Sequence, residues 1–126
     1  MQTATVPGRA AATATLATSL RRAERTYKLT SVEYAPSADI TGTATNSLTL
    51  ELRNRGQDDS INVLVASLAL VAGTNASRGF ARDVPRVVTN GTPLVTEGDR
   101  LEWVSVKVGT GLTDPGGTAL VNGAAI

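Results

Sequence analysis

The sequence predicts an all-β protein: an antiparallel β-sandwich or barrel of about six to eight short strands with an extended basic N-terminal arm. Two observations lead to this prediction. Stretches rich in Val, Thr and Leu recur along the chain, and clusters of Gly, Pro, Asn and Asp separate them as turns between strands require. The regular alternation of strands and helices that marks a parallel nucleotide-binding sheet is missing from the pattern.

Length and composition indicate one globular domain. The chain has 126 residues, of which 41% are hydrophobic and 3% aromatic, which is enough to bury a core. It contains no cysteine and no histidine, so thiolate nucleophiles, zinc-finger ligands and the commonest general base are missing. We therefore expect a binding or structural protein that is not an enzyme, with no metal and no cofactor. No apolar run has the length of a membrane span, so we expect no membrane partner.

The formal charge of +1 is unevenly distributed. Residues 1–28 carry +4 and residues 29–126 carry −3. We therefore divide the chain into a basic arm over residues 1–26, flexible or ordered on binding, and a β-sandwich domain over residues 27–126. Basic arms commonly bind an acidic protein face, a membrane surface or nucleic acid. The basic residues that we consider as partner contacts are Arg9, Arg21, Arg22, Arg25 and Lys28.

Three alternatives for residues 1–26 stay open. The segment is also typical of a solvated tail, and its Arg-rich, acid-poor composition fits a mitochondrial transit peptide. A short helix across Thr15–Thr26 is the third, because Leu16, Leu20, Ala23 and Tyr27 recur at three- to four-residue spacing.

The first half of the body contains two predicted strands. Residues 27–34 form one, which ends at Ala35-Pro36; its alternation slips between Leu29 and Val32, which indicates a bulge or a strand buried on both faces. Residues 37–46 form a loop or weak edge segment. Residues 47–54 form the clearest strand, with Leu48, Leu50 and Leu52 on one face and polar residues on the other. Residues 55–60 form a turn.

The second half continues the pattern. Residues 61–71 are apolar at nearly every position and predict a central strand buried on both faces, with a helix over 64–72 as the alternative. Residues 75–86 form a loop or one helical turn, and 86–89 a short strand before the Asn90-Gly91 turn. Leu94-Val95-Thr96 leads into a turn at 97–99. Residues 100–108 form the second well-defined strand, 109–117 a long turn and 118–122 a last strand.

Trp103 and the turn before it have two interpretations. As the single tryptophan, Trp103 is a candidate binding anchor. Its position between Leu101 and Ser105 on one strand face favours a core role. In the preceding turn, Gly98 supplies an unusual backbone angle and Asp99 bonds back to turn amides.

Other candidate chemical sites are weak. Gly109-Thr110-Gly111 superficially resembles a phosphate loop, but Pro115 lies where the required helix would run. Asp58, Asp59, Asp99 and Asp114 lack the ligand spacing of a calcium loop and suit turns. The acceptor patterns at Asn75 and Asn90 lack a secretory signal, and no pair of carboxylates stands out as a glycosidase pair.

Several stretches of the body share a pattern with a known family. They are Thr30-Ser31-Val32-Glu33-Tyr34-Ala35-Pro36, Ile40-Thr41-Gly42, Asn54-Arg55-Gly56-Gln57-Asp58, Val65-Ala66-Ser67-Leu68-Ala69-Leu70, Gly98-Asp99-Arg100-Leu101-Glu102-Trp103-Val104-Ser105 and Gly109-Thr110-Gly111-Leu112-Thr113-Asp114-Pro115-Gly116-Gly117. In this order they resemble the small capsid decoration (cement) proteins of tailed bacteriophages, those of actinobacterial hosts in particular. The resemblance spans roughly residues 29–121.

The resemblance implies a β-rich virion structural protein, assembled in the host cytoplasm, that binds the outside of an icosahedral phage head and stabilises it. It also implies the major capsid protein as partner and a homotrimer as the binding unit. The sequence departs from the family pattern in the arm over residues 1–26 and in the segment Arg78–Arg86. We expect Arg9, Arg21, Arg22, Arg25 and Lys28 to contact acidic capsid surface.

Two other functions compete with capsid decoration. A carbohydrate- or receptor-binding β-sandwich module of a phage fibre or spike is the first, and it would use exposed aromatic residues. A nucleic-acid-binding protein with a basic arm is the second. The acidic body disfavours it, because nucleic acid attracts positive charge, so we expect no nucleic-acid partner.

Overall fold

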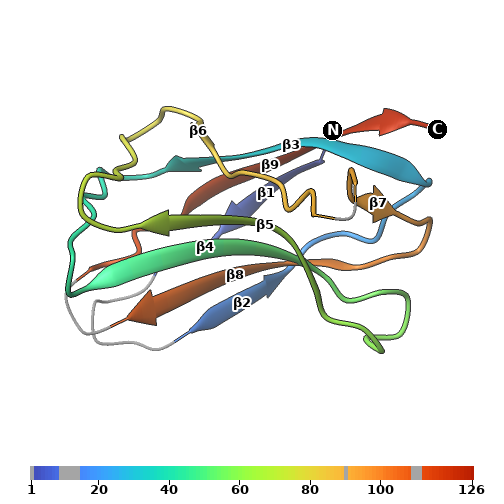
Figure 1. Ribbon diagram of the computed structural model, residues 1–126, viewed down its shortest axis with the longest axis horizontal. Coiled ribbons are helices and arrows are strands. Elements are labelled where there is room, and N and C mark those ends of the chain that lie inside the picture. Colours follow the sequence, from blue (N-terminus) through green and yellow to red (C-terminus); the bar gives the residue numbers. More distant parts are fainter. Residues whose placement is uncertain (1, 9–14, 90, 109–111) are drawn as a thin grey trace.

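The computed structural model describes residues 2–8, 15–89, 91–108 and 112–126. Within them, nine strands form two antiparallel sheets that face each other (Figure 1). One sheet has the order β1-β9-β3-β6, with β7 also paired to β3, and comprises β1 (Gln2–Val6), β9 (Gly117–Ala125), β3 (Tyr27–Pro36), β6 (Arg82–Asp83) and β7 (Leu94–Val95). The other has the order β2-β8-β4-β5 and comprises β2 (Leu16–Ser19), β8 (Leu101–Val108), β4 (Ser47–Asn54) and β5 (Val63–Leu70).

The predicted all-β antiparallel sandwich is confirmed. The described residues form more strands than the expected six to eight or so, because the N-terminal segment adds two and the second half adds the two-residue strands β6 and β7.

The two strands with the clearest alternation form the centre of the four-stranded sheet. β4 matches its predicted bounds, and Leu48, Leu50 and Leu52 are fully buried between the sheets. β8 begins one residue later than predicted and buries Leu101 and Trp103 beside them. Strict alternation places every second side chain on one face, so a strand with a regular pattern has only one favourable orientation in the sheet.

The slip predicted early in β3 is a bulge. The pairing of β3 with β9 shifts between Leu29 and Ser31, and Leu29 and Val32 are both fully buried on either side of the shift. The bulge resets the alternation, so that both apolar residues face the core.

The prediction of a central strand over residues 61–71 is wrong. β5 is the last strand of the four-stranded sheet, and Val63 is 49% exposed. Burial along β5 alternates from Ala66 to Leu70, and Val65 is buried as well. The helix alternative over 64–72 is also wrong, because the strand continues to Leu70. An apolar run indicates burial but not where the strand lies in the sheet.

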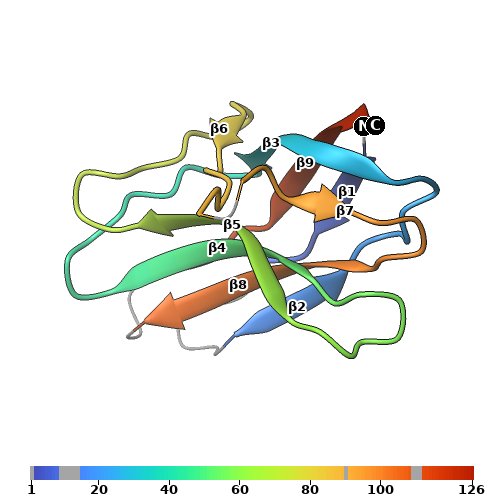
Figure 2. The same cartoon turned by 45° about the vertical axis from the view of Figure 1, so that its right-hand side comes forward.

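The segment after β6 covers the outer edge of β5. The amide of Ser67 donates to the carbonyl oxygen of Pro85 at 3.0 Å, and the amide of Val87 donates to that of Val65 at 2.9 Å. Just before, the amide of Val84 donates to the carbonyl oxygen of Val32 in the opposite sheet. The chain therefore crosses from one sheet to the other here (Figure 2) and protects an edge that would otherwise be open to another chain. The strand predicted over 86–89 is reduced to single bridges at Arg86 and Thr89.

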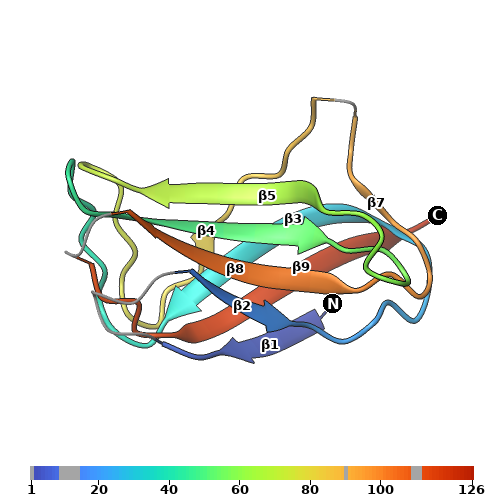
Figure 3. The ribbon, with the colours of Figure 1, turned by 90° about the horizontal axis from the view of Figure 1, so that it is seen from below.

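The N-terminal segment is part of the sandwich. β1 pairs with β9 and β2 pairs with β8, so these two strands lie along the side opposite β5 (Figure 3). Side chains along β1 and β2 alternate between exposed and more buried positions, which suits strands at the edge of a sandwich. Thr3, Thr5 and Ala17 are exposed, whereas Val6 at the end of β1 and Leu20 just after β2 are buried. The strand Leu16–Ser19 replaces the short helix considered over Thr15–Thr26.

The two ends of the sandwich differ in what they carry. One end gathers residues 20–26, 55–62 and 96–100 together with the start of β1 and the end of β9, and the opposite end gathers residues 37–46 and 71–81 (Figures 1 and 3). We call the first of these the basic end after its link at residues 20–26, where three arginines outnumber the one acid, Glu24. The two turns beside the link carry both signs of charge: Arg55, Asp58, Asp59, Glu97, Asp99 and Arg100.

Candidate functional site

The basic residues expected to contact a partner fall into three groups. Arg21 and Arg25 are exposed in the link between β2 and β3, and Lys28 is exposed on the outer face of β3. Arg22 is tied to the protein itself: its Nη1 donates to the carbonyl oxygens of Gln57 at 2.7 Å and Gly98 at 3.0 Å. Arg9 lies outside the described residues. The structure therefore brings Arg21, Arg22 and Arg25 together and gives Arg22 a positioning role.

The link that carries these arginines is firmly attached to the turn at residues 96–100. The amide of Ala23 donates to the carbonyl oxygen of Asp99, and the amide of Gly98 donates to that of Ala23, both at 2.9 Å. The amide of Glu97 donates to Thr26 Oγ1 at 3.0 Å. These bonds make the link a defined part of the surface, which lowers the entropic cost of using Arg21 and Arg25 in binding.

The turn itself depends on a buried carboxylate, as predicted. Asp99 Oδ2 accepts from the amide of Thr96 and from Asn54 Nδ2, both at 2.9 Å. Asn54 Oδ1 in turn accepts from the amide of Gly56 at 2.8 Å. The pair Asn54–Asp99 thus joins the turn at 55–60 to the turn at 96–100, and both turns carry a carbonyl that holds Arg22.

A recess of about 480 Å³ opens beside the link. Its walls come from the link, the start of β1 and the end of β9. Its lining residues are Gln2, Arg21, Arg22, Ala23, Glu24, Arg25, Tyr27, Val121, Gly123 and Ala125. Burial raises the pKa of the Tyr27 phenol above its ordinary value, and the nearby charge of Asp99 adds to the effect.

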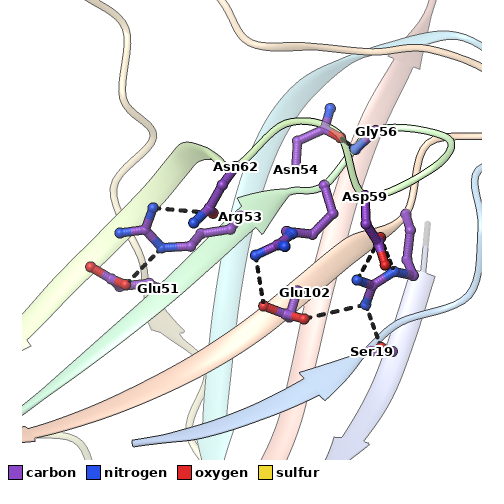
Figure 4. Close-up of polar contacts among 10 residues, drawn as sticks. Ser19, Glu51, Arg53, Asn54, Gly56, Asp59, Asn62 and Glu102 are labelled. Carbon is purple, nitrogen blue, oxygen red and sulfur yellow. Dashed lines mark hydrogen bonds and ion pairs between the residues drawn. The ribbon is translucent and has the colours of Figure 1, made fainter.

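The outer face of the four-stranded sheet carries a row of ion pairs (Figure 4). Arg100 donates two hydrogen bonds to Asp59 Oδ1, from Nε at 2.9 Å and from Nη2 at 2.7 Å. Its Nη1 also donates to Glu102 Oε2 at 3.3 Å and to the Ser19 hydroxyl. Arg53 Nε donates to Glu51 Oε1 at 3.0 Å. The hydrogen bonds that Arg100 donates to Asp59 are the main reason that the pKa of Arg100 lies above its ordinary value.

The charges of this row pair mainly with one another, unlike those of the link at residues 20–26. Arg55 also belongs to the row: its Nη1 lies 3.9 Å from Glu102 Oε1, and its buried Nε has no hydrogen-bond partner among the described residues. Arg53 and Arg100 bind the carboxylates of Glu51 and Asp59 at 3.0 and 2.7 Å. In the link, Arg21 lies 3.9 Å from Glu24 with both side chains exposed, and Arg25 is exposed as well. Sequence reasoning did not single out the row. The signal was present in Glu51 and Arg53, and in Arg100 and Glu102, which are two residues apart and therefore share the outward face of a strand.

Trp103 belongs to the core, and the binding-anchor interpretation is wrong. It is 2% exposed and stacks on Tyr34, with a distance of 5.4 Å between the ring centroids and an angle of 24° between the ring planes. Next to this pair lies the buried carboxylate of Asp114, which accepts from Ser105 Oγ at 2.5 Å, from the amide of Gly116 at 3.0 Å and from the Tyr34 hydroxyl at 3.4 Å. This network joins β8, β3 and the segment just before β9.

A pH titration of stability tests the environment of Tyr34. Burial is the main cause that raises its pKa above 10.0, and the charge and hydrogen bond of Asp114 add to it. Above about pH 10 the unfolded chain ionises this phenol while the folded protein keeps it neutral. The stability that the raised pKa of Tyr34 implies is therefore fully present below pH 10. It is lost as pH rises toward the folded-state pKa, at a limiting rate of about 1.4 kcal/mol per pH unit.

We expect Tyr34→Phe to reduce the stability lost between pH 9 and 11 by about 1.4 kcal/mol over the whole interval, measured by urea unfolding, because the unfolded-state phenol is half ionised near pH 10. The readout is the slope, because the substitution also removes a hydrogen bond at all these pH values. Equal slopes for the two proteins would contradict the assignment.

The remaining candidate sites find no support in the described part of the chain. No group of three or more potential metal ligands gathers there, so Asp58, Asp59, Asp99 and Asp114 do not form one site. The proposed phosphate loop, Gly109-Thr110-Gly111, lies outside the described residues. No helix of the described ranges is long and apolar enough to cross a bilayer. Comparison with known proteins adds no family: no family model matches the chain, and no curated protein is similar to it.

Proposed function

We propose that this protein is a virion structural protein that binds the outer surface of an icosahedral phage head as a capsid decoration protein and stabilises it. The resemblance of roughly residues 29–121 to decoration proteins of tailed phages supports this proposal. The structural observation that carries it is the link at the basic end. This link is firmly attached to the turn at residues 96–100 and presents Arg21 and Arg25 exposed, whereas Arg53 and Arg100 bind carboxylates of the protein itself.

The segments that resemble decoration proteins have connected roles in this fold. Asn54–Asp58 and Gly98–Ser105 are joined by the Asn54–Asp99 hydrogen bond and by the amide of Arg55, which donates to the carbonyl oxygen of Arg100 at 2.8 Å. In the segment Ile40–Gly42, the amide of Gly42 donates to Asn75 Oδ1 at 2.9 Å. A side chain at this glycine would meet the Val71 carbonyl oxygen at 2.0 Å. These three segments thus help to set turns of the sandwich, whereas residues 30–36 and 65–70 lie in β3 and β5.

In this proposal the major capsid protein contributes an acidic surface to the basic end. Arg21, Arg25 and Lys28 contact that surface, Arg22 holds the link in place, and Arg9 remains a candidate contact outside the described residues. A homotrimer would present three basic ends to a shell of repeated sites. Three linked contacts give high avidity even when each one is weak.

Charge reversal at the basic end tests the proposal. We expect Arg21→Glu with Arg25→Glu to weaken binding to undecorated capsids at least about tenfold, or about 1.4 kcal/mol, because attraction to an acidic surface becomes repulsion. Cosedimentation over a range of protein concentrations measures the apparent Kd. We also expect wild-type binding to weaken as salt rises.

The matched control is Arg78→Glu with Arg82→Glu, which makes the same charge change with exposed residues toward the opposite end. We expect it to bind as wild type. Equal loss in both variants would show a general charge effect, and unchanged binding of the first variant would exclude the basic end as the contact. Imaging of the mixture tests decoration itself: added density on the shell supports it, and a bare shell contradicts it.

The fibre or spike alternative depends on exposed aromatic residues, and the structure offers few. Of the four aromatic side chains, Trp103 and Tyr34 are buried, Tyr27 is partly buried, and Phe80 is 73% exposed. A single exposed ring is a small platform for a sugar, so decoration remains the function that we propose.

A further inference from the structure

The recess at the basic end lies beside the last part of β9, which carries small residues. Val121, Gly123 and Ala125 alternate along one face of β9, and all three line the recess. Gly123 has no side chain, and the Tyr27 ring occupies its place, since a Cβ there would lie 2.2 Å from the ring. At about 480 Å³, the space falls within the range of small-ligand sites, about 300–1,000 Å³.

The charged groups around this space are mostly positive. Arg21, Arg22 and Arg25 line it together with one acid, Glu24. Glu24 lies 3.9 Å from Arg21, with both side chains more than 70% exposed, so this pair neutralises little of the charge. The carbonyl oxygens that hold Arg22 fix its position but leave its positive charge in place. The site therefore favours an anion.

We propose that this recess binds an acidic, extended peptide segment, with carboxylates facing Arg21 and Arg25. Guanidinium groups match carboxylates in geometry and charge. Tyr27, which is partly buried, and Ala125, which is exposed, supply apolar surface for the aliphatic part of a glutamate side chain, which a free phosphate could not use. The inference rests on the proposed function and deepens it: the capsid partner inserts an acidic segment instead of meeting the basic end as a flat surface.

The test is a titration of the whole protein with a capped triglutamate peptide, in which NMR amide chemical shifts report binding. We expect saturable shifts at Gly123, Ala125 and Tyr27 that weaken as salt rises. Capped triglutamine is the uncharged control, and inorganic phosphate is the second anion. Phosphate binding as tight as triglutamate would overturn the peptide assignment in favour of a general anion site.

Two variants separate insertion from surface attraction. Arg21→Ala with Arg25→Ala removes charge and should weaken triglutamate binding at least about tenfold. Ala125→Leu fills the recess and keeps every charge, and it should weaken triglutamate binding by a similar factor. Unchanged binding by Ala125→Leu would overturn insertion. The charge control, Arg78→Ala with Arg82→Ala, should bind as wild type, and equal loss there would contradict the site.

Capsid binding by the same variants distinguishes failure of this inference from failure of the proposed function. If wild-type protein decorates capsids but does not bind triglutamate, the proposed peptide site in the recess is wrong and the proposed function is still supported. Protein that binds triglutamate through Arg21, Arg25 and the open recess but leaves capsids bare would support the recess and overturn decoration.

Discussion

Replacing Trp103 by alanine is expected to lower the free energy of unfolding by about 3–5 kcal/mol. Trp103 is 2% exposed, and its ring stacks on Tyr34 between the two sheets. Removing it leaves a cavity, deletes the apolar area that it buries and breaks an aromatic contact. Domains of this size are stable by only about 5–15 kcal/mol, so this one change would remove a large part of the total.

Urea unfolding followed by far-ultraviolet circular dichroism measures this loss without relying on the deleted fluorophore. The matched control is Phe80→Ala, which removes a ring that is 73% exposed and should change stability by no more than about 0.5 kcal/mol. Similar losses in both variants would contradict the core position of Trp103.

Replacing Asp114 by alanine should cost about 3 kcal/mol. The carboxylate is buried and accepts from the Ser105 hydroxyl, the Tyr34 hydroxyl and the amide of Gly116. Alanine leaves all three donors without this acceptor in the core, and an unsatisfied buried polar group costs much more than a hydrogen bond contributes. Thermal and urea unfolding of the purified variant measure the cost.

The exposed Asp83 provides the comparison, because Asp83→Ala also removes one carboxylate. We expect its stability to remain within about 0.5 kcal/mol of wild type. If Asp114→Ala unfolds at the same denaturant concentration as Asp83→Ala, the three hydrogen bonds do not contribute as proposed. The two stability predictions concern neighbouring groups, since Trp103 stacks on the ring whose hydroxyl reaches Asp114, so their effects need not be additive.

Regular alternation made part of this fold predictable. Leu48, Leu50 and Leu52 identified β4 with its observed bounds, and the irregular spacing of Leu29 and Val32 indicated the bulge in β3. In both cases the information is local, because adjacent side chains on a strand point to opposite faces. Asp99 was predictable for the same reason, as a short polar side chain bonds to amides close to it in the chain.

Long-range pairing could not be predicted in this way. The run over 61–71 indicated burial, but only the chain segment at 84–87 explains why an apolar strand can lie at a sheet edge. Residues 1–26 were expected to form an arm because of their charge, whereas their alternation of Ala and Thr with Gln2, Val6 and Leu16 allows β1 and β2 to complete the two sheets. Charge describes the surface of a segment and does not decide whether its backbone finds a partner.

The sequence by itself determined that the protein is a β-sandwich, which side chains of β4 and β8 form its core and where its main turns lie, because these properties depend on neighbours a few residues apart. Only the tertiary structure decided which arginines are available to a partner. Arg21, Arg22 and Arg25 look alike in the sequence, yet Arg22 is held by carbonyl oxygens of Gln57 and Gly98, which are distant in the chain. The physical reason is that a charge becomes either a structural or a binding group through the atoms that folding places beside it.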